Sequence, residues 1–261
     1  MKVLVTGAGG ILGRRVVAAL TRLIDSIEIV KFRGNLTHPD DVSHNLKHAR
    51  HFDAVIHLAA MVSVPEVAAN PSQAHAVNVA GTINLLNGLQ EIGSKPYFLY
   101  ASSAHIYKPD KGPISENAPK SPISLYGHTK WLGEQVAAQI CEQSNQTFCA
   151  ARIFSLWDEE QKPPYLFGAM KKRFSEEDLN KPFFVHSAGS LRDFSSASQI
   201  ADIICKLLIQ RISGPINVAS GKATEIGEFV QSIAPQPLNI STNSVKSNLI
   251  ADISKLKEAL S

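Results

Sequence analysis

A glycine-rich turn near the start of the chain limits the possible folds most strongly. The apolar run Val3–Thr6 leads directly into Gly7-Ala8-Gly9-Gly10-Ile11-Leu12-Gly13, and a helix is predicted to begin near Ile11. Glycine tolerates positive φ values and has no Cβ to obstruct a close approach of the backbone. A helix N-terminus adds free N–H donors and the positive end of the helix dipole, which together suit a pyrophosphate.

The spacing of these glycines distinguishes between the known types of phosphate-binding loop. Glycines at positions 7, 10 and 13 fit the pattern GxxGxxG, whereas GxGxxG fails because position 12 is Leu. A Walker A loop is excluded because the turn contains no Lys followed by Ser or Thr. A purely structural βα turn is the alternative, but the position between the first strand and an apolar helix favours a dinucleotide-binding turn.

Short apolar runs alternate with segments of helical periodicity through the first half of the chain. The predicted strands are Val3–Thr6, Ile27–Phe32, Ala54–Leu58 and Tyr97–Ala101, and the predicted helices are Arg14–Leu23, Asn78–Leu89 and Tyr126–Ile140. The runs are nearly continuous in hydrophobicity, as in strands buried on both faces of a parallel sheet. We therefore expect an α/β fold, a Rossmann doubly wound parallel sheet with a small C-terminal substrate-binding lobe.

The pattern becomes less regular after a further strand predicted at Phe148–Phe154. Beyond it we predict a helix at Ile200–Ile209, a strand at Ile216–Ala219 and a helix at Ile226–Ile233. Residues 1–155 are predicted to form the dinucleotide-binding Rossmann domain. Residues 156–261 are predicted to form mostly the substrate-binding lobe, with some segments returning to the main sheet.

Composition excludes several classes of protein. The 261 residues are 44% hydrophobic, which is typical of a globular chain, and 26 Lys and Arg against 23 Asp and Glu give a net charge of +3. That charge is too small to indicate a nucleic-acid partner, and no apolar stretch reaches the length of a membrane span. No signal peptide is predicted, and the scattered Cys141, Cys149 and Cys205 favour a reducing compartment, so a cytoplasmic protein is expected.

A tyrosine and a lysine stand one helical turn apart in Tyr126-Gly127-His128-Thr129-Lys130. Such a pair shares one helix face. Because a nearby ammonium favours the phenolate, we expect Lys130 to lower the pKa of Tyr126 from its usual value near 10. The strand at Tyr97–Ala101 ends in Ser102-Ser103, at the edge where open α/β sheets bind ligands. A hydroxyl there can hold the substrate oxygen that Tyr126 protonates.

The end of the second predicted strand bears on the choice of nicotinamide cofactor. An acidic side chain at that position binds the ribose 2′-hydroxyl of NAD, whereas Arg or Lys meets the 2′-phosphate of NADP. Glu28 lies near the start of this strand, while Lys31 and Arg33 lie towards its end. Arg14, directly after the last glycine, adds a second cation. The sequence therefore favours NADP(H) among the NAD(P) cofactors.

Together with other motifs, these features resemble the extended short-chain dehydrogenase/reductases, and within them the NAD(P)-dependent nucleotide-sugar epimerase/dehydratase family. The matching segments span nearly the whole chain: Thr6–Gly13, Gly34-Asn35-Leu36-Thr37, His57-Leu58-Ala59-Ala60, Asn78-Val79-Ala80-Gly81-Thr82, Ala101-Ser102-Ser103-Ala104, Ser124–Lys130, Leu191-Arg192-Asp193-Phe194 and Ala251-Asp252-Ile253-Ser254-Lys255. The resemblance implies an enzyme with a nicotinamide cofactor and a nucleotide-activated sugar as substrate.

The resemblance also implies individual roles. Tyr126 would be the acid or base, Lys130 would hold the nicotinamide ribose, and Ser103 would bind the reacting oxygen. With the cations above, the candidate cofactor-binding residues are Gly7, Gly10, Ile11, Leu12, Gly13, Arg14, Arg33, Asn35, Leu36, Ala59, Ala60, Asn78, Tyr126 and Lys130. The candidate substrate-binding residues are Ser103, His105, Phe154, Ser155 and the diphosphate-binding Arg192. For His105, a bystander role at the rim of the site is the alternative.

The chain departs from the family pattern at several positions. One strand fits between the first helix and Gly34, so the second βα unit is abridged and the adenine pocket must be unusual. The substitutions are Asn35 for Asp, Lys108 for Gly, Ser155 for Asn, Asp158-Glu159 for Gly-Pro, and Ala197 and Gln199 for Val and Asp. We expect intact cofactor chemistry and a retuned sugar-binding side.

The residues that follow Ser103 limit the reactions that the enzyme could catalyse. Ser103 is followed by Ala104-His105 rather than the Asp-Glu pair of the family's dehydratases, so dehydration is not expected. Two reactions remain possible. One is reduction of a keto-sugar nucleotide with Tyr126 as proton donor, and the other is 4-epimerisation through a transient ketone with tightly bound NAD. The NADP(H) preference favours the reductase. A non-catalytic dinucleotide-binding protein is a third alternative, disfavoured because Tyr126 and Lys130 are both present.

Two further expectations concern partners and metals. The helices predicted at Asn78–Leu89 and Tyr126–Ile140 resemble those through which family members dimerise, so a homodimer is expected. His44, His48 and His51 follow helical spacing, but a solvated helix surface explains them better than a metal site does. No metal is therefore predicted.

Overall fold

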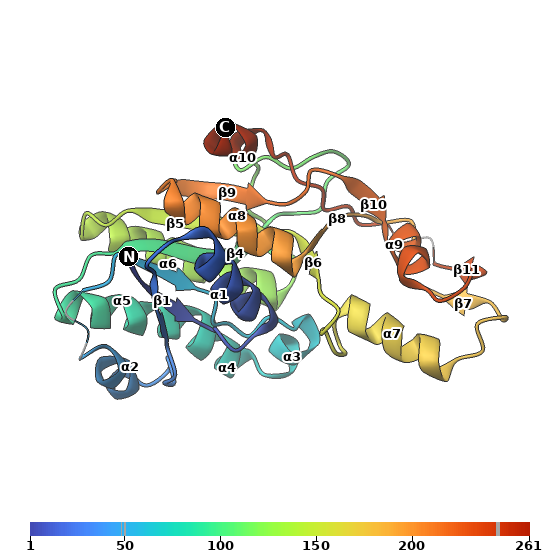
Figure 1. The fold of residues 1–261 in the computed structure, drawn as a ribbon. Coiled ribbons are helices and arrows are strands. Elements are labelled where there is room, and N and C mark those ends of the chain that lie inside the picture. Colours follow the sequence, from blue (N-terminus) through green and yellow to red (C-terminus); the bar gives the residue numbers. More distant parts are fainter. Residues whose placement is uncertain (48, 50, 244–245) are drawn as a thin grey trace.

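The computed structural model describes residues 1–47, 49, 51–243 and 246–261. Its centre is a six-stranded sheet in the order β2-β1-β3-β4-β5-β9, with all neighbouring strands parallel. The strands are β1 (Lys2–Thr6), β2 (Glu28–Lys31), β3 (Ala54–His57), β4 (Tyr97–Ser103), β5 (Phe148–Ile153) and β9 (Gly214–Val218). Figure 1 shows the sheet between helices, with a smaller lobe at one end. The predicted Rossmann α/β class is confirmed.

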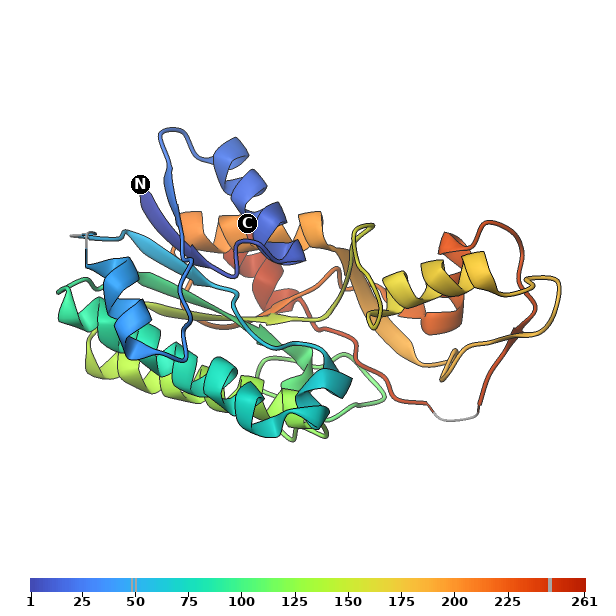
Figure 2. The same cartoon turned by 90° about the horizontal axis from the view of Figure 1, so that it is seen from below.

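Helices cover both faces of the sheet (Figure 2). One layer consists of α1 (Ile11–Leu23), α8 (Ala197–Ile209) and α10 (Ser254–Leu260), and the other of α2 (Pro39–Leu46), α5 (Gly81–Glu91) and α6 (Leu125–Gln143). Because side chains alternate along a strand, Val3 and Val5 pack beneath the first layer and Leu4 packs beneath the second. The central strands are buried on both faces, as their apolar runs predict.

The strand predicted at Ile27–Phe32 is an exception to this burial. It forms β2 at the edge of the sheet, and its four residues are exposed or half-buried. The classic order 3-2-1-4-5-6 has another strand outside this position. Here the chain passes from β2 into a short loop and then α2, so the outermost strand is missing. The abridged second βα unit therefore has a direct structural counterpart, an edge strand open to solvent.

The connection between β3 and α5 is built from short helical pieces. They are α3 (Val64–Ala69), α4 (Pro71–His75) and the π-helix η1 (Ala76–Ala80), while the 3-10 turn η2 (Ala104–Ile106) follows β4. These pieces lie at the carboxyl ends of the parallel strands, where ligands bind in such sheets. Proline at the start of α3 and of α4 suits the first turn of a helix.

The C-terminal part of the chain contributes to both the sheet and the lobe. Strand β9 pairs with β5, and α8 packs on α1, so these elements belong to the Rossmann body. The lobe contains β6 (Ser155–Trp157), α7 (Leu166–Glu176), β7 (Phe183–Phe184), β8 (Leu191–Ser196), β10 (Ala223–Glu225), α9 (Ile226–Ile233) and β11 (Ile240–Ser241). Strands β10-β8-β6 form one small sheet and β11-β7 another.

Several predictions about individual residues can be compared with the fold. Cys141, Cys149 and Cys205 are all free and buried, as their spacing predicts. The prediction that His44, His48 and His51 share one helix surface is wrong, because α2 ends at Leu46, before His51. His48 lies outside the described residues. Among the residues that the structure describes, no metal-binding group of side chains is found, and no helix is long and apolar enough to cross a membrane.

Candidate cofactor and catalytic site

The glycine turn brings the start of α1 against the end of β3. Gly7 has φ +67°, and a Cβ at Gly7 would lie 2.8 Å from the backbone nitrogen of Ala59. A Cβ at Gly13 would lie 2.1 Å from the carbonyl oxygen of Gly7. Both positions therefore exclude any side chain. Gly10 is the N-cap of α1, and in the described part of the chain neither a side-chain cap nor a first-turn acid competes for the free N–H groups of Ile11, Leu12 and Gly13.

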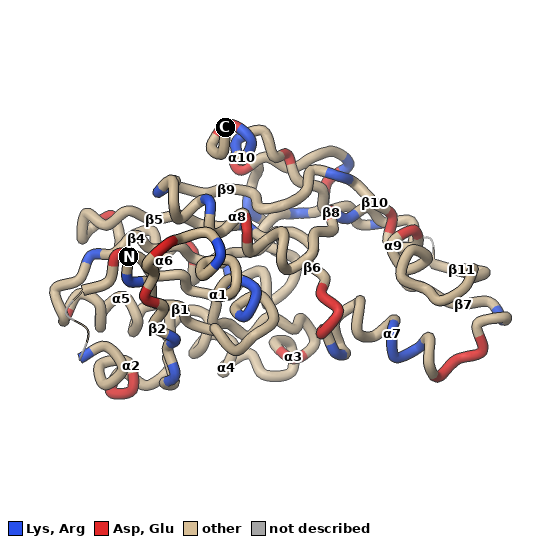
Figure 3. The backbone as a smooth tube through the Cα atoms, in the orientation of Figure 1, with Lys and Arg blue, Asp and Glu red and all other residues tan. Residues whose placement is uncertain are grey.

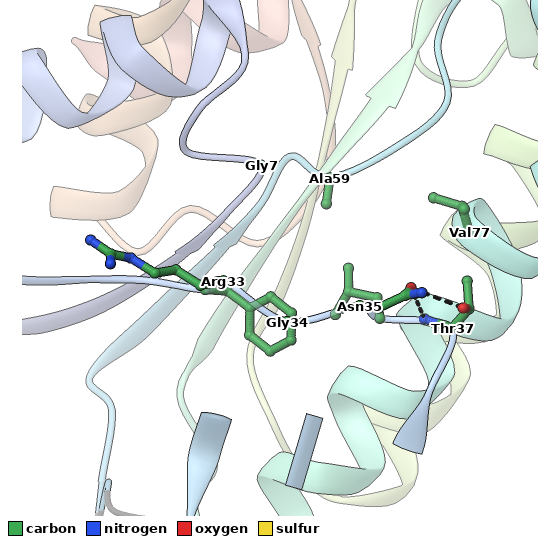
Figure 4. A pocket seen from close by; sticks show the side chains of 9 residues that line it. Gly7, Arg33, Gly34, Asn35, Thr37, Ala59 and Val77 are labelled. Carbon is green, nitrogen blue, oxygen red and sulfur yellow. Dashed lines mark hydrogen bonds between the residues drawn. The ribbon is translucent and has the colours of Figure 1, made fainter. Parts of the chain in front are cut away.

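A cavity of about 320 Å³ opens beside this turn, between the ends of β1, β2 and β3 (Figure 4). Its lining consists of Gly7, Phe32, Arg33, Gly34, Asn35, Leu36, Thr37, Ala59 and Val77. Five predicted cofactor-binding residues therefore line a single cavity at the switch point of the sheet. Phe32, Gly34, Thr37 and Val77 were not predicted, although Gly34 and Thr37 belong to a motif that the resemblance used. The Arg33 side chain extends away from Asn35 and Thr37 (Figure 4).

Asn35 organises the wall of this cavity. Its side-chain oxygen accepts hydrogen bonds from the backbone N–H of Thr37, at 3.0 Å, and from the Thr37 hydroxyl, at 2.8 Å. Its own backbone N–H donates to Asp41 on α2. With the oxygen engaged in this way, the amide NH₂ is the part of the Asn35 side chain left to meet a ligand. An aspartate would offer acceptors alone.

Two predicted cations near the glycine turn have different surroundings. Arg14 donates to the carbonyl oxygen of Gly9, at 2.8 Å, and forms an ion pair with Glu160, at 2.6 Å. Its guanidinium is therefore already engaged by a carboxylate of the lobe. Arg33 is exposed at the cavity and has no ion-pair partner among the residues described. Of the two, Arg33 is the cation that no carboxylate of the described residues neutralises.

A buried histidine fixes the turn that follows β3. Thr82 donates its hydroxyl proton to the carbonyl oxygen of Asn78, so it accepts from His57 Nε2. His57 Nδ1 then accepts from the Thr6 hydroxyl, whose oxygen accepts the backbone N–H of Ala59. Burial lowers the pKa of His57 to about 3, which keeps the ring neutral in this chain of bonds. The histidine was part of a matching motif, but its role was not predicted.

Asn78 and Ala60, both predicted to lie along the cofactor, differ in how the fold uses them. The Asn78 side chain accepts from the backbone N–H of Met61 and donates to the Met61 carbonyl and to Thr129 Oγ1. It thereby ties η1, α6 and the segment after β3 together from a buried position. Ala60 is half-buried in that same segment, next to the cavity-lining Ala59. Their contacts with a cofactor stay predictions.

The end of β4 and the start of α6 bring the predicted catalytic residues together. Ser124 caps α6 by accepting the backbone N–H of Gly127. A Cβ at Gly127 would lie 2.1 Å from the carbonyl oxygen of His105, so this glycine allows α6 to contact η2. The Tyr126 ring then packs edge-on against His105, with 5.4 Å between ring centroids. The Ser103 hydroxyl accepts the backbone N–H of the same His105, at 3.2 Å.

The protonation of Tyr126 differs from the prediction. Burial raises the pKa of Tyr126 to about 12, although the adjacent Ser103 hydroxyl opposes the shift. The expected lowering by Lys130 is therefore wrong for this state of the protein. The physical reason is desolvation, which penalises the phenolate more than its hydrogen bond stabilises it. Tyr126 is therefore a protonated phenol at neutral pH.

Lys130 occupies a buried position one turn further along α6. Its ammonium nitrogen lies 4.2 Å from the centroid of the Tyr100 ring, and no hydrogen-bond acceptor for it is found in the described part of the chain. Burial lowers the pKa of Lys130 to about 7, and Glu134 on the next turn opposes the shift. A buried ammonium with free donors fits a ribose hydroxyl as its partner. Together with the glycine cradle, it shows that the residues suit a dinucleotide.

Four of the predicted substrate-binding residues, His105, Arg192 and the two that follow β5, differ in their surroundings. Burial and the nearby Arg192 guanidinium lower the pKa of His105. Arg192 donates to the carbonyl oxygens of Leu191 and Ser247, which orients its guanidinium. Ser155 is half-buried, whereas Phe154 is 6% exposed and packs with Tyr107 in the core. A direct contact between Phe154 and the sugar stays a prediction.

Tyr165, which the sequence analysis did not single out, also belongs to this region. It is the N-cap residue of α7, and it lies close enough to Tyr126 to raise the pKa of that phenol. Its own pKa is raised by burial and by Glu66 on α3. Tyr165 stands in the irregular, proline-containing segment after β6, where helical or strand periodicity gives no signal.

Fold and site together define the class of protein. The parallel Rossmann sheet has a glycine cradle at its switch point, with Ser103 at the end of β4 and Tyr126 and Lys130 on α6. These features are those of a dinucleotide-binding α/β enzyme. The model of the NAD-dependent epimerase/dehydratase family matches residues 3–219. The chain belongs to this family of NAD(P)-dependent enzymes.

Relatives in the family carry out two kinds of reaction. UDP-glucose 4-epimerase of Lactobacillus helveticus is 31% identical over 173 residues, which are 60% of this chain and 52% of the relative. The chain thus spans about half the length of that relative. GDP-6-deoxy-D-mannose reductase of Pseudomonas aeruginosa is 26% identical over 242 residues, which are 89% of this chain and 79% of the relative. The matched relatives thus include a nucleotide-sugar 4-epimerase and a nucleotide-sugar reductase.

Solved structures agree on the fold. RMD from Pseudomonas aeruginosa, complexed with NADPH, has a TM-score of 0.88 at 24% identity, covering 99% of this chain and 92% of that one. UDP-glucose 4-epimerase of Thermus thermophilus, in complex with NAD, has a TM-score of 0.85 at 22% identity with the same coverage. These structures bind different nicotinamide cofactors on one architecture.

Proposed function

We propose that this protein reduces the keto group of a keto-sugar nucleotide with NADPH. The observation that carries the proposal is the protonated Tyr126, which lies with Ser103 and His105 at the end of β4 and one turn before the buried Lys130. Reduction of a ketone needs a proton donor at the carbonyl oxygen, and the Tyr126 hydroxyl, grouped with Ser103 at the end of β4, is placed to be that donor.

Each residue has a task in this reaction. The bound nicotinamide supplies a hydride. Ser103 donates a hydrogen bond to the carbonyl oxygen, and Tyr126 transfers its proton to that oxygen as charge develops on it. Lys130 holds the ribose with its free ammonium donors and stabilises the phenolate that Tyr126 becomes. His105, neutral and packed on Tyr126, limits the access of water to the phenol.

The predicted preference for NADP(H) is part of the proposal. Glu28, at the start of β2, is paired with Lys2 at 2.9 Å and lies at the opposite end of the strand from the cavity. Arg33 lines the cavity instead, at the position where a 2′-phosphate would need a cation. Arg14 contributes less to this preference because Glu160 already neutralises it.

On the substrate side we propose that Arg192 binds the diphosphate. Its guanidinium is held in place by two backbone carbonyl oxygens and lies near His105, so it faces the same region as Tyr126. Ser155 replaces the larger family asparagine in this region, which leaves room for a different sugar.

A 4-epimerase with tightly retained NAD is the second candidate, favoured by the identity to the Lactobacillus helveticus enzyme. One experiment separates the two. The purified protein is denatured and assayed for released nicotinamide cofactor, and a second sample is mixed with NADPH and 4-keto-sugar nucleotides that carry GDP, dTDP or UDP. Loss of NADPH absorbance by a protein without bound cofactor supports the reductase. Stoichiometric NAD with interconversion of UDP-sugars supports the epimerase.

We also propose that the protein is a cytoplasmic homodimer that associates through α5 and α6. Leu132, on the outer side of α6, is 43% exposed and would be covered by the partner. Sedimentation of the protein and of Leu132→Glu tests the dimer. A wild type that sediments as a monomer would remove this part of the proposal.

A further inference from the structure

A buried ion pair lies directly beneath the catalytic residues. Glu134, one turn beyond Lys130 on α6, pairs with Arg152 on β5 at 2.6 Å, and the two side chains are 4% and 3% exposed. The Glu134 carboxylate also accepts a hydrogen bond from the Ser102 hydroxyl on β4. Glu134 therefore joins α6 to the ends of both central strands.

Arg152 is itself fixed by further partners. It donates to the Tyr107 hydroxyl and to the carbonyl oxygen of Glu116, each at 2.8 Å. Tyr107 in turn donates to Asn217 on β9, at 2.9 Å. The ion pair is thus the centre of a hydrogen-bond network that extends across β4, β5, β9 and α6. With its donors so fully used, Arg152 holds the Glu134 carboxylate in one place.

Stability alone is a weak reason for such a pair. Burying two charges carries a desolvation cost, and well-packed apolar side chains of similar volume often replace a buried pair without loss of stability. Lys130 and Glu134 are at i and i+4, so they face the same side of α6. Ser102 directly precedes Ser103 in the strand. The network therefore reaches Ser103 through the adjacent Ser102, and Lys130 through Glu134 one helical turn away.

We propose that Glu134, anchored by Arg152, is a positioning residue that holds α6 against the end of β4 and supplies the negative charge that faces the Lys130 ammonium. This inference rests on the proposed function, since it assigns Glu134 to the same reaction. Glu134 itself need not touch the substrate or the cofactor. It acts through Lys130 and through the bond between Ser102 and α6.

The other charged and titratable groups around Lys130 do not supply this negative charge. His57 from β3 is neutral, because burial lowers its pKa to about 3. Tyr100 from β4 is a protonated phenol, because burial raises its pKa well above 10. Tyr126 from α6 is also protonated. Arg152 from β5 is a cation, so within the described chain Glu134 is the anion that raises the pKa of Lys130.

The first test uses Glu134→Gln, which keeps the size of the side chain and removes its charge. Without the carboxylate the pKa of Lys130 falls, so the ammonium is lost at lower pH. We expect the alkaline limb of kcat to move down by about one pH unit, which is about a tenfold loss of kcat above that limb. Glu142→Gln, at an exposed position of the same helix, is the matched control and should leave the profile unchanged.

The second measurement works without turnover. Labelling of the Lys130 amine by an acylating reagent is followed by mass spectrometry against pH in the cofactor-free protein. Glu134→Gln should be labelled at lower pH than the wild type. This readout reports on Lys130 even if no keto-sugar nucleotide is reduced, so failure of the proposed function and failure of this inference are distinguishable.

Two more variants keep the inference falsifiable if Glu134→Gln does not fold. Glu134→Leu combined with Arg152→Met removes the whole pair without leaving a buried charge. Ser102→Ala cuts the link to β4 and keeps the carboxylate, so kcat should fall while the labelling profile stays in place. If the folded double variant has the kcat and the Lys130 labelling profile of the wild type, Glu134 and Arg152 have a structural role and the inference is wrong.

Discussion

The Arg15 guanidinium donates two hydrogen bonds to the Asp158 carboxylate, at 2.8 and 3.0 Å, and so ties the first turns of α1 to the segment that follows β6. Glu160 adds a second contact to Arg15, at 2.8 Å, and also pairs with Arg14. Figure 3 shows this acidic segment directly after β6. Asp158 stands where the family pattern has Gly, so a departure from that pattern has become a contact beside the dinucleotide turn.

Removal of this contact should loosen the segment that Arg14 and Arg15 hold beside the glycine turn. Asp158→Ala loses two charge-assisted bonds and the acceptor for the Glu160 backbone N–H, so we expect a cost of about 2 kcal/mol and a fall in Tm of about 4–8 °C. NADPH should also dissociate faster from the variant, which stopped-flow fluorescence measures. The neighbouring exposed Glu159→Gln is the control. An unchanged Tm and release rate for Asp158→Ala would contradict this account.

The same ion pair predicts a response to acid. Its hydrogen bonds with Arg15 hold the pKa of Asp158 below its usual range. A carboxyl whose pKa is lower in the folded state stabilises the fold above its unfolded pKa of about 3.9, and this contribution disappears as the pH falls through the folded pKa. Wild type and Asp158→Ala should therefore differ in stability at pH 7 and converge as the pH falls below about 3.9 and through the folded pKa of Asp158. Urea denaturation at several pH values measures the difference.

Much of this fold was predictable because local signals and burial agree. The apolar runs at Ala54–Leu58 and Tyr97–Ala101 became central strands, and the spacing at Ile226–Ile233 gave α9 with its observed bounds. The run at Ile27–Phe32 looked equally buried, yet β2 is an exposed edge strand. The burial of this strand depends on whether another strand lies beside it. The residues of the run itself do not show that this outer strand is absent.

Some features of the site were also predictable from the sequence, and others were not. Gly7, Asn35 and Ala59 could be placed together because a motif fixes the turn, and the structure puts them around one cavity. The protonation of Tyr126 could not be predicted, because desolvation depends on what α6 and η2 cover in three dimensions. Contacts of the lobe, such as those of Glu160 with Arg14, join positions far apart in the sequence and leave no local pattern.

Substitution of the proton donor gives the sharpest test of the reaction. Tyr126→Phe keeps the ring against His105 but removes the hydroxyl, so NADPH should bind with nearly unchanged affinity while kcat falls by about 10²–10⁴-fold. Fluorescence titration with NADPH and steady-state assays measure the two quantities. A Phe variant with turnover close to that of the wild type would exclude Tyr126 as the donor.

The choice between NADPH and NADH should depend on Arg33 more than on Arg14. Arg33→Ala removes the exposed cation at the cavity, and we expect NADPH to bind about tenfold more weakly with little change for NADH. Arg14→Ala removes a guanidinium already paired with Glu160, so its effect on NADPH should be smaller. Calorimetric titrations of both variants with both cofactors test this order. Equal affinities of the wild type for NADPH and NADH would remove the preference altogether.

The two glycines of the turn that differ most in their surroundings make a matched pair. A Cβ at Gly13 would meet the carbonyl oxygen of Gly7 at 2.1 Å, whereas a Cβ at Gly9 has nothing within 4 Å. Gly13→Ala should therefore destabilise the cofactor-free protein by more than about 2 kcal/mol, because backbone would have to move. Gly9→Ala should be close to neutral. Similar Tm values for the two variants would show that α1 can shift away from the turn.

Burial of Lys130 should lower the free energy of unfolding of the cofactor-free protein. The pKa of Lys130 is about 7 in the folded protein and about 10.4 in an unfolded chain, so between these values the unfolded state binds more protons. Stability contributed through Lys130 therefore rises with pH from about 7 to about 10, and below pH 7 the fold carries a buried charge. Lys130→Met should raise the Tm of the cofactor-free protein at pH 6, by an amount that shrinks towards pH 10, and abolish turnover.

Lys206→Met, at an exposed position of α8, should show neither effect. If Lys130→Met were less stable than the wild type at pH 6, the ammonium would have a partner that offsets its burial.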